Sequence, residues 1–212
     1  MTQRRSVPVA AGLRLLVTVA GAVLVAALAS GCNGSHHRTA ATTPTPTPIA
    51  RLHAGDVQLV RAPFCDRVPA SAVRRALGAK AGTHDTWGNG DPVPGSTDSD
   101  DVGHELGCTW TAASGPAARA WVFARPVTAD FARTVLAQAG KQQGCTAEPA
   151  TVFGTPAVLQ TCTLTGDVRR VRRAGLFGDS WVTCELAGPA ATDPRTRLDA
   201  WCAEVVAAVS AS

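Results

Sequence analysis

The sequence predicts one α+β domain in which an antiparallel sheet is covered by helices, in the order α-β-β-α-β-β-β-α. Three observations carry this prediction. Apolar residues alternate with polar ones in several short segments joined by Gly-containing turns, and they recur at helical spacing in three other segments. Short links between consecutive strands favour antiparallel pairing, and we expect the helices to cover one face of the sheet. Six cysteines in the folded part add three expected disulfides.

Residues 1–31 have the organisation of a bacterial export signal. The first 14 residues carry three arginines and no acid, and residues 15–29 form an uncharged apolar run. Such a run rises only about 22 Å as a helix, less than the ~30 Å hydrocarbon core of a bilayer, so a cleaved signal is favoured over a membrane span. The run ends at Ala29-Ser30-Gly31-Cys32.

Residues 32–60 are predicted to be a tether in front of a folded domain at 61–212. The stretch from Asn33 to Ala50 has almost no apolar side chain and contains three Thr-Pro repeats. Proline fixes φ and favours polyproline II, which extends by ~3 Å per residue. The tether would therefore hold the domain away from its point of attachment.

The first helix of the domain is expected over residues 69–78. Val73 and Leu77 share one face, and Gly78 ends the helix. A stretch rich in Gly, Pro and Asp follows at 82–103 and predicts a loop.

Acidic residues gather at the end of this loop, in the stretch 90–105, and the loop is also expected to expose Trp87. With one histidine, they are Asp91, Asp98, Asp100, Asp101, His104 and Glu105. Oxygen ligands suit Ca²⁺, but Val102 stands where an EF-hand has its third ligand. We therefore expect solvated acids and no metal site.

Two strands and a second helix come next. The strands are expected at 106–111 and 118–125, where apolar residues alternate with others. Thr128 is the expected N-cap of the helix that follows, and Gly140 ends it.

The C-terminal part is predicted as a three-stranded meander and a final helix. The strands lie at 156–165, 168–176 and 180–187 and are joined by turns with Gly-Asp pairs. Asp193 is the expected N-cap of the last helix. Its apolar positions follow at helical spacing: Leu198, Trp201, Cys202, Val205 and Val209.

Six cysteines follow Cys32, an even number that predicts three disulfides in an exported chain. They are Cys65, Cys108, Cys145, Cys162, Cys184 and Cys202, and none has the C-x-x-C spacing of a zinc or thioredoxin-type site. Six cysteines allow fifteen pairings, among which we prefer pairing of nearest neighbours. The expected positions of the side chains support only the pair Cys184 and Cys202, because both would point into the layer between the sheet and the last helix.

Two resemblances rest on these motifs. Ala29-Ser30-Gly31-Cys32 resembles the lipobox of bacterial lipoproteins, in which the Cys thiol takes a diacylglyceryl group and the Cys becomes the acylated N-terminus. This resemblance implies that Cys32 is lipidated, with acyl chains such as palmitate, and attaches the protein to the extracytoplasmic face of the cell membrane. With the Thr-Pro tether, the segment from Cys65 to Gly78 and the motif Cys108-Thr-Trp110 resemble actinobacterial lipoproteins of unknown function from streptomycetes and mycobacteria.

Charge and motifs limit the function classes. Three of the 20 basic residues precede Cys32 and all 16 acidic residues follow it, so the mature chain has a net charge near +1 and no nucleic-acid partner is expected. The sequence lacks the G-x-S-x-G, S-x-x-K, H-E-x-x-H and P-loop motifs, and neither an enzyme nor a cofactor is predicted.

The sequence VRRVRR concentrates positive charge in one predicted strand. On a strand, Arg170 and Arg172 face one way whereas Arg169 and Arg173 face the other, so the four suit a charged edge strand. The alternative interpretation is a contact with anionic lipid, a cell-wall polymer or an acidic envelope protein.

A non-enzymatic binding or accessory lipoprotein of the cell envelope is the function that these features favour. Two alternatives stay open: an extracytoplasmic sensor module beside a membrane protein, and an envelope hydrolase with an unrecognised catalytic constellation. No motif identifies the ligand.

Overall fold

The structure is a computed structural model that describes residues 45–52, 54–92 and 102–211. All of these residues belong to one compact unit. The helices are α1 (Ala70–Leu77), α2 (Ala129–Ala139) and α3 (Arg195–Val209). The strands are β1 (Ala81–Trp87), β2 (Glu105–Ala112), β3 (Ala117–Phe123), β4 (Cys145–Pro149), β5 (Ala157–Leu164), β6 (Val168–Phe177) and β7 (Ser180–Pro189). Short 3-10 helices lie at η1 (Ile49–Arg51), η2 (Cys65–Arg67) and η3 (Ala190–Thr192).

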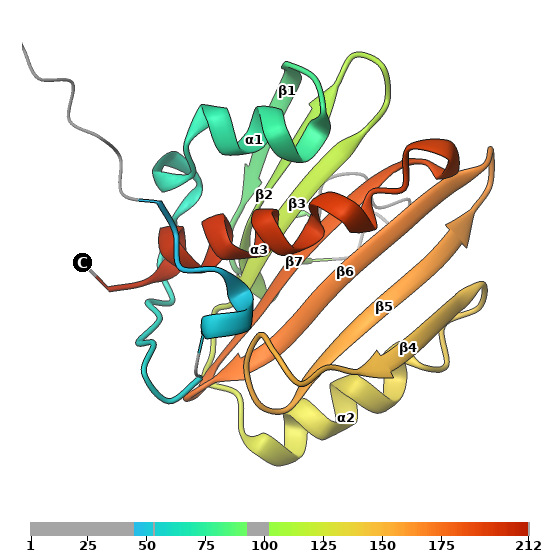
Figure 1. Ribbon diagram of the computed structural model, residues 1–212. Coiled ribbons are helices and arrows are strands. Elements are labelled where there is room, and N and C mark those ends of the chain that lie inside the picture. Colours follow the sequence, from blue (N-terminus) through green and yellow to red (C-terminus); the bar gives the residue numbers. More distant parts are fainter. Residues whose placement is uncertain (1–44, 53, 93–101, 212) are drawn as a thin grey trace, which may run out of the picture. The chain divides into compact units, whose positions relative to one another are not determined.

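The strands form one antiparallel sheet in the order β1-β2-β3-β7-β6-β5-β4 (Figure 1). Strands β1 to β3 are neighbours in chain order, and so are β4 to β7. The two groups join where β7 pairs with β3. The predicted α+β domain with an antiparallel sheet covered by helices is therefore confirmed.

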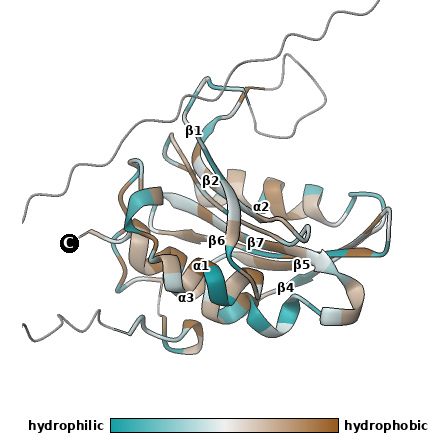
Figure 2. Cartoon of the chain, turned by 90° about the horizontal axis from the view of Figure 1, so that it is seen from above, coloured by the Kyte–Doolittle hydropathy of each residue, from teal (hydrophilic) through white to brown (hydrophobic). Residues whose placement is uncertain are grey.

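The helices cover both faces of this sheet, so the expectation that they share one face is wrong. Helices α1 and α3 lie on one side, and α2 lies on the other (Figure 2). Strand β7 shows the reason, because Val182 and Leu186 join the core that includes α3 whereas Trp181 joins a second cluster with Ala132 of α2. Successive residues of a strand point to opposite faces, so apolar residues on both sides of β7 call for cover on both sides. We refer to these sides as the α3 face and the α2 face.

The α3 face holds the main core. Nine residues of α3 are buried, including Leu198, Trp201 and Val205. The Trp201 ring meets Trp110 edge-on with ring centroids 5.5 Å apart, and its Nε1 donates a hydrogen bond to the Arg119 carbonyl at 3.0 Å. Strand and helix side chains are thus closely packed on this face.

All three predicted disulfides are present. The Cα atoms are 5.8 Å apart in Cys65–Cys108, 4.0 Å apart in Cys145–Cys162 and 5.4 Å apart in Cys184–Cys202. The first joins η2 to β2, the second joins β4 to β5, and the third joins β7 to α3. The position argued for the last pair, between the sheet and the final helix, is confirmed.

Two strands lie where none was predicted. Strand β1 occupies part of the 82–103 stretch that was expected to be loop, and β4 precedes the predicted meander. Both are edge strands with mostly exposed side chains, so neither shows the apolar alternation that marks a strand in a sequence. Trp87, expected to be exposed, is buried at the end of β1, where its ring lies against Gly107 and leaves no room for a side chain there.

The folded unit begins earlier than residue 61. Ile49 of η1 is buried in the main core. Farther along, the Val60 amide donates to the Val209 carbonyl at 2.8 Å, so this segment also runs beside the end of α3. Within the described ranges, no helix has the length and apolar character needed to cross a membrane.

Candidate functional site

The α2 face of the sheet carries a row of polar residues that crosses six strands. Paired from strand to strand, this polar row runs Asp85, Thr109, Arg119, Glu185, Arg172 and Gln160. Side chains directly opposite each other on antiparallel strands lie about 5 Å apart at Cβ, so they interact. The register of the sheet thus places Glu185 between two arginines.

Three arginines surround the Glu185 carboxylate. It lies 4.0 Å from Arg119 Nη1, 3.7 Å from Arg170 Nε and 3.9 Å from Arg172 Nη1. These are ion-pair distances, longer than hydrogen bonds. We call these four residues the guanidinium cluster. Because one carboxylate faces three guanidinium groups, the cluster keeps a surplus of positive charge.

Glu185, Arg170 and Arg172 of the guanidinium cluster are largely withdrawn from solvent, whereas the Arg119 side chain is 38% exposed. The side chain of Glu185 is 5% exposed, that of Arg170 is 19% exposed and that of Arg172 is 24% exposed. Burial lowers the pKa of Arg172; the Glu185 carboxylate opposes this shift, and the Arg170 guanidinium adds to it. Partly buried cations with too little negative charge around them are stabilised by an incoming anion.

The segment after α2 closes one side of the cluster. Arg172 Nη2 donates to Gln142 Oε1 at 3.0 Å, and Gln160 Nε2 donates to the same oxygen at 3.2 Å. Gln160 Nε2 also donates to the Ala139 carbonyl at 2.6 Å, which ties the end of α2 to the sheet. These contacts hold the Arg172 guanidinium at the edge of α2.

A hollow of about 410 Å³ lies between α2 and the sheet, beside the guanidinium cluster. Its lining residues are Trp121, Phe123, Val135, Gln138, Ala139, Gln142, Val158, Arg172, Ala174, Trp181 and Thr183. We call it the α2 hollow. Most of its wall is aromatic or aliphatic, and Arg172 is the charged member of the lining. Apolar walls with a few placed polar groups are typical of small-molecule sites of this size.

The hollow exists because α2 is lightly packed. The helix begins as predicted, since Thr128 Oγ1 accepts a hydrogen bond from the Phe131 amide at 3.2 Å. Within α2, Ala132 alone is buried, and the Phe131 side chain is 51% exposed with its ring 6.4 Å from that of Phe123. A small side chain at the main contact leaves space beneath the rest of the helix.

The four arginines of VRRVRR do not form an edge patch. Strand β6 lies inside the sheet, between β5 and β7, so the edge-strand interpretation is wrong. The predicted alternation is confirmed, because two of the four join the guanidinium cluster and the other two pair with acids near α3: Arg169 with Asp193 at 3.4 Å and Arg173 with Asp199 at 2.8 Å. Each of the four arginines therefore lies near an acid of a neighbouring element, and Arg169 is also 38% exposed to solvent.

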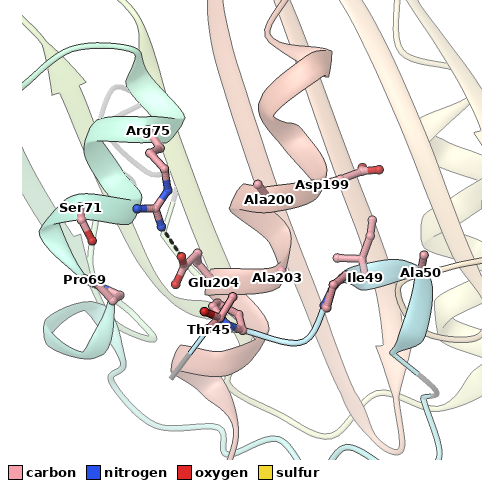
Figure 3. A pocket seen from close by; sticks show the side chains of 12 residues that line it. Thr45, Ile49, Ala50, Pro69, Ser71, Arg75, Asp199, Ala200, Ala203 and Glu204 are labelled. Atoms are coloured by element: carbon pink, nitrogen blue, oxygen red, sulfur yellow. Dashed lines mark hydrogen bonds and ion pairs between the residues drawn. The ribbon is translucent and has the colours of Figure 1, made fainter. Parts of the chain in front are cut away.

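A larger groove, of about 640 Å³, lies between α1, α3 and the segment at residues 45–50 (Figure 3). Its charged side chains already have partners, because Arg75 pairs with Glu204 and Asp199 pairs with Arg173. A ligand in this groove would find these charges neutralised. The α2 hollow is therefore the better candidate for a binding site.

Within the part of the chain that the structure describes, one cluster combines residue types that bind metals. The ligand atoms of Cys65, His84 and Cys108 lie within 4.8 Å of one another. The two cysteines form a disulfide, however, so they offer no thiolate. The His84 ring stacks on Trp110 with centroids 4.8 Å apart. This cluster is a disulfide covered by an aromatic stack.

Other residues singled out in the sequence fall partly outside the described ranges. Cys32 lies outside them, and so do Asp98, Asp100 and Asp101. Asp91 Oδ2 accepts a hydrogen bond from the Gly88 amide at 2.7 Å, and Glu105 Oε2 accepts one from the His104 amide at 2.8 Å. The described members of the acidic loop thus bond to nearby backbone.

Sequence reasoning missed Arg119, Glu185 and Trp121 as site residues. Each takes an alternate position in a strand whose other face is apolar, in the segments ARAWVFAR and SWVTCELA. That alternation marks side chains that point away from the main core. Which residue of a neighbouring strand lies opposite each of them depends on the order of the strands in the sheet. The alternation within one strand does not reveal that order.

Comparisons with known proteins do not indicate a function for this site. No protein-family model matches the chain, and no curated protein matches it. Among solved structures, the chain is similar to the extracellular domain of PknH from Mycobacterium tuberculosis, with 17% identity and a TM-score of 0.39 over 70% of this chain and 99% of that chain. A similarity of this size carries no argument about function.

Proposed function

We propose that this protein is a membrane-anchored, non-enzymatic binding module on the extracytoplasmic side of the cell envelope, with the α2 hollow as its ligand site. The observation that supports this best is the surplus positive charge of the guanidinium cluster beside an apolar hollow. Among the described residues that line the hollow, none is a histidine, a cysteine or a carboxylate, so these residues offer no pair of nucleophile and base. Binding is therefore favoured over hydrolysis.

The disulfides support the extracytoplasmic location. Disulfides form and persist in oxidising compartments and are rare in the cytosol. All six cysteines after Cys32 are paired, and each pair links two different elements of the fold. Oxidative folding outside the cytoplasm accounts for this pairing.

The anchor would be lipid on Cys32. One acyl chain holds a protein only marginally on a membrane, whereas two or three anchor it stably. The Thr-Pro segment between Cys32 and the start of the domain would act as a semi-rigid spacer of about 40 Å at most. The domain would then work close to the membrane surface without being inserted in it.

Mass spectrometry of the mature N-terminus tests the anchor. We expect N-terminal Cys32 with a diacylglyceryl group, and we expect the Cys32→Ser variant to keep its signal segment and carry no lipid. An unmodified Cys32 in the wild-type protein, or cleavage at another position, would contradict the anchor.

The binding site is tested by filling the hollow from its helix side. Val135 lines the hollow from α2, whereas Ala137 is exposed on the same helix. Wild-type protein and the variants Val135→Trp and Ala137→Trp are purified at full length, and bound small molecules are measured by mass spectrometry after extraction. We expect Val135→Trp to lose a molecule that the wild type and Ala137→Trp retain. Equal extracts from all three proteins would contradict the site.

A further inference from the structure

We infer that the ligand of the α2 hollow is an amphiphile with an oxyanion head, carboxylate or phosphate, and an apolar body. This inference rests on the proposed function and names the chemistry of its ligand. The head would bind at Arg172, and the body would lie along the aromatic wall of the hollow.

The Arg172 guanidinium has donors to spare. One of its nitrogens bonds to Gln142, and the closest approach of Nη1 to the Glu185 carboxylate, 3.9 Å, is too long for a hydrogen bond. A guanidinium carries five N–H donors in a planar fork that matches the two oxygens of a carboxylate or phosphate. An oxyanion in the hollow would therefore complete the bonding of Arg172.

The surroundings of Arg172 favour an anion over other heads. Arg170 and Arg119 add positive charge on the same face, and Glu185 is the single acid of the guanidinium cluster. A cationic head would be repelled by this surplus. A neutral head would leave it uncompensated in a partly buried place, where charge interacts strongly.

The apolar body has a matching surface beside the polar row. A second row on the same face runs in register through Trp87, Gly107, Trp121, Thr183, Ala174 and Val158. Residues two positions apart on a strand lie about 7 Å apart on one face, so this apolar row runs about 7 Å from the polar row. A molecule with its head at Arg172 would place its body over Trp121 and Ala174, both of which line the hollow.

The rim of the hollow continues this surface. Phe123 lines the hollow, and its ring lies 6.4 Å from that of Phe131, which is half exposed on α2. Aromatic rings at an entrance provide apolar contact area for a chain that extends beyond the hollow. The site therefore suits a body longer than the hollow itself.

Photocrosslinking of the full-length lipoprotein in a neutral detergent tests this inference. The probes are a long-chain fatty acid that carries a diazirine and an alkyne, its methyl ester, and the phosphate monoester of the same chain. Labelled peptides are mapped by mass spectrometry. We expect both anionic probes to label α2, β3 or β6 at least about tenfold more than the methyl ester does, because charge-assisted hydrogen bonds to a head contribute at least this factor. The stronger of the two anionic probes identifies a carboxylate or a phosphate source.

Variants of adjacent residues on β6 locate the head. Arg172→Gln should reduce labelling by the fatty acid to the level of the methyl ester, whereas Arg173→Gln, on the opposite face, should leave it unchanged. The comparison of fatty acid and methyl ester on the wild-type protein needs no variant. It therefore tests the preference for an anionic head even where Arg172→Gln fails to fold. Equal labelling of the hollow by acid and ester would overturn the inference and leave the proposed binding site standing. Absence of labelling by all probes would overturn the inference, and the extraction experiment with Val135→Trp would then decide the binding site separately.

Discussion

The two faces of the sheet differ in how completely their helices cover them. On the α3 face, nine residues of α3 are buried, a disulfide ties the helix to β7, and the arginines of β6 are matched one to one by Asp193 and Asp199. On the α2 face, α2 buries Ala132 alone, and three arginines share Glu185. Strand β6 supplies two arginines to each face. The difference in charge matching between the faces therefore arises from the acids available on the neighbouring elements.

This difference separates the part of the molecule that maintains the fold from the part that can bind. A closely packed, charge-matched face gains stability from nearly every side chain. A face with unfilled volume and unmatched charge gives up stability, and natural binding sites commonly do this. Substitutions on the two faces should therefore have effects that differ in size and in sign.

The largest effect is expected from truncation of a central side chain on the α3 face. Trp201→Ala removes a buried ring and its hydrogen bond to Arg119, and should lower the free energy of unfolding by about 3–5 kcal/mol. Leu136→Ala on α2 removes a half-buried side chain and should cost about 1 kcal/mol. Urea denaturation followed by circular dichroism measures both. Equal losses would break the contrast between the faces.

Two disulfides with nearly equal loops give a second comparison. Sequence separations are 18 residues for Cys184–Cys202 and 17 for Cys145–Cys162, so the chain-entropy model assigns each about 3 kcal/mol. Double replacement by alanine should cost more at Cys184–Cys202, because both of its cysteines are fully buried and leave a cavity in the main core. Thermal unfolding of the two double variants measures the difference. A larger loss of stability on replacement of Cys145–Cys162, which joins the edge strand β4 to β5, would contradict the view that the α3 face holds the main core.

The α3 face was largely predictable from the sequence, whereas the α2 face was not. Helical spacing from Leu198 to Val209 gives the buried stripe of α3 and the position of Cys202, and alternation gives the inward side of β7. These signals are local, because each depends only on how often apolar residues recur within one helix or strand that packs against one core.

The candidate site depends instead on strand order. Arg119 and Glu185 are far apart in sequence, and they meet because β3 pairs with β7. Arginine-rich β6 looked like an edge strand, since the acids that match its charges come from other elements. The true edges, β1 and β4, have mostly exposed side chains and therefore carry little apolar pattern.

The smallest expected effects distinguish adjacent arginines on β6. Burial lowers the pKa of Arg172, so the folded protein holds this proton less tightly than the unfolded chain does. At neutral pH the Arg172 side chain is charged in both the folded and the unfolded state, and its charge therefore lowers the stability of the folded protein.

Arg172→Met should raise the free energy of unfolding by up to about 1 kcal/mol. Arg173→Met loses a pairing with the exposed Asp199 and should lower it by up to about 1 kcal/mol. Urea denaturation of both variants checks the sign, and a loss in Arg172→Met equal to that in Arg173→Met would contradict the view that Arg172 is kept for binding.

Amide hydrogen exchange on the full-length protein, with and without a long-chain fatty acid, tests most directly whether the α2 face is the binding face. Without the fatty acid, we expect α2 to exchange faster than α3, because few of its side chains are buried. With it, we expect slower exchange in α2 and in the β3 and β6 segments that line the hollow, and no change in α1 or α3. Slower exchange confined to α1 and α3 would contradict the assignment of binding to the α2 face, and no change anywhere would contradict the inferred ligand chemistry.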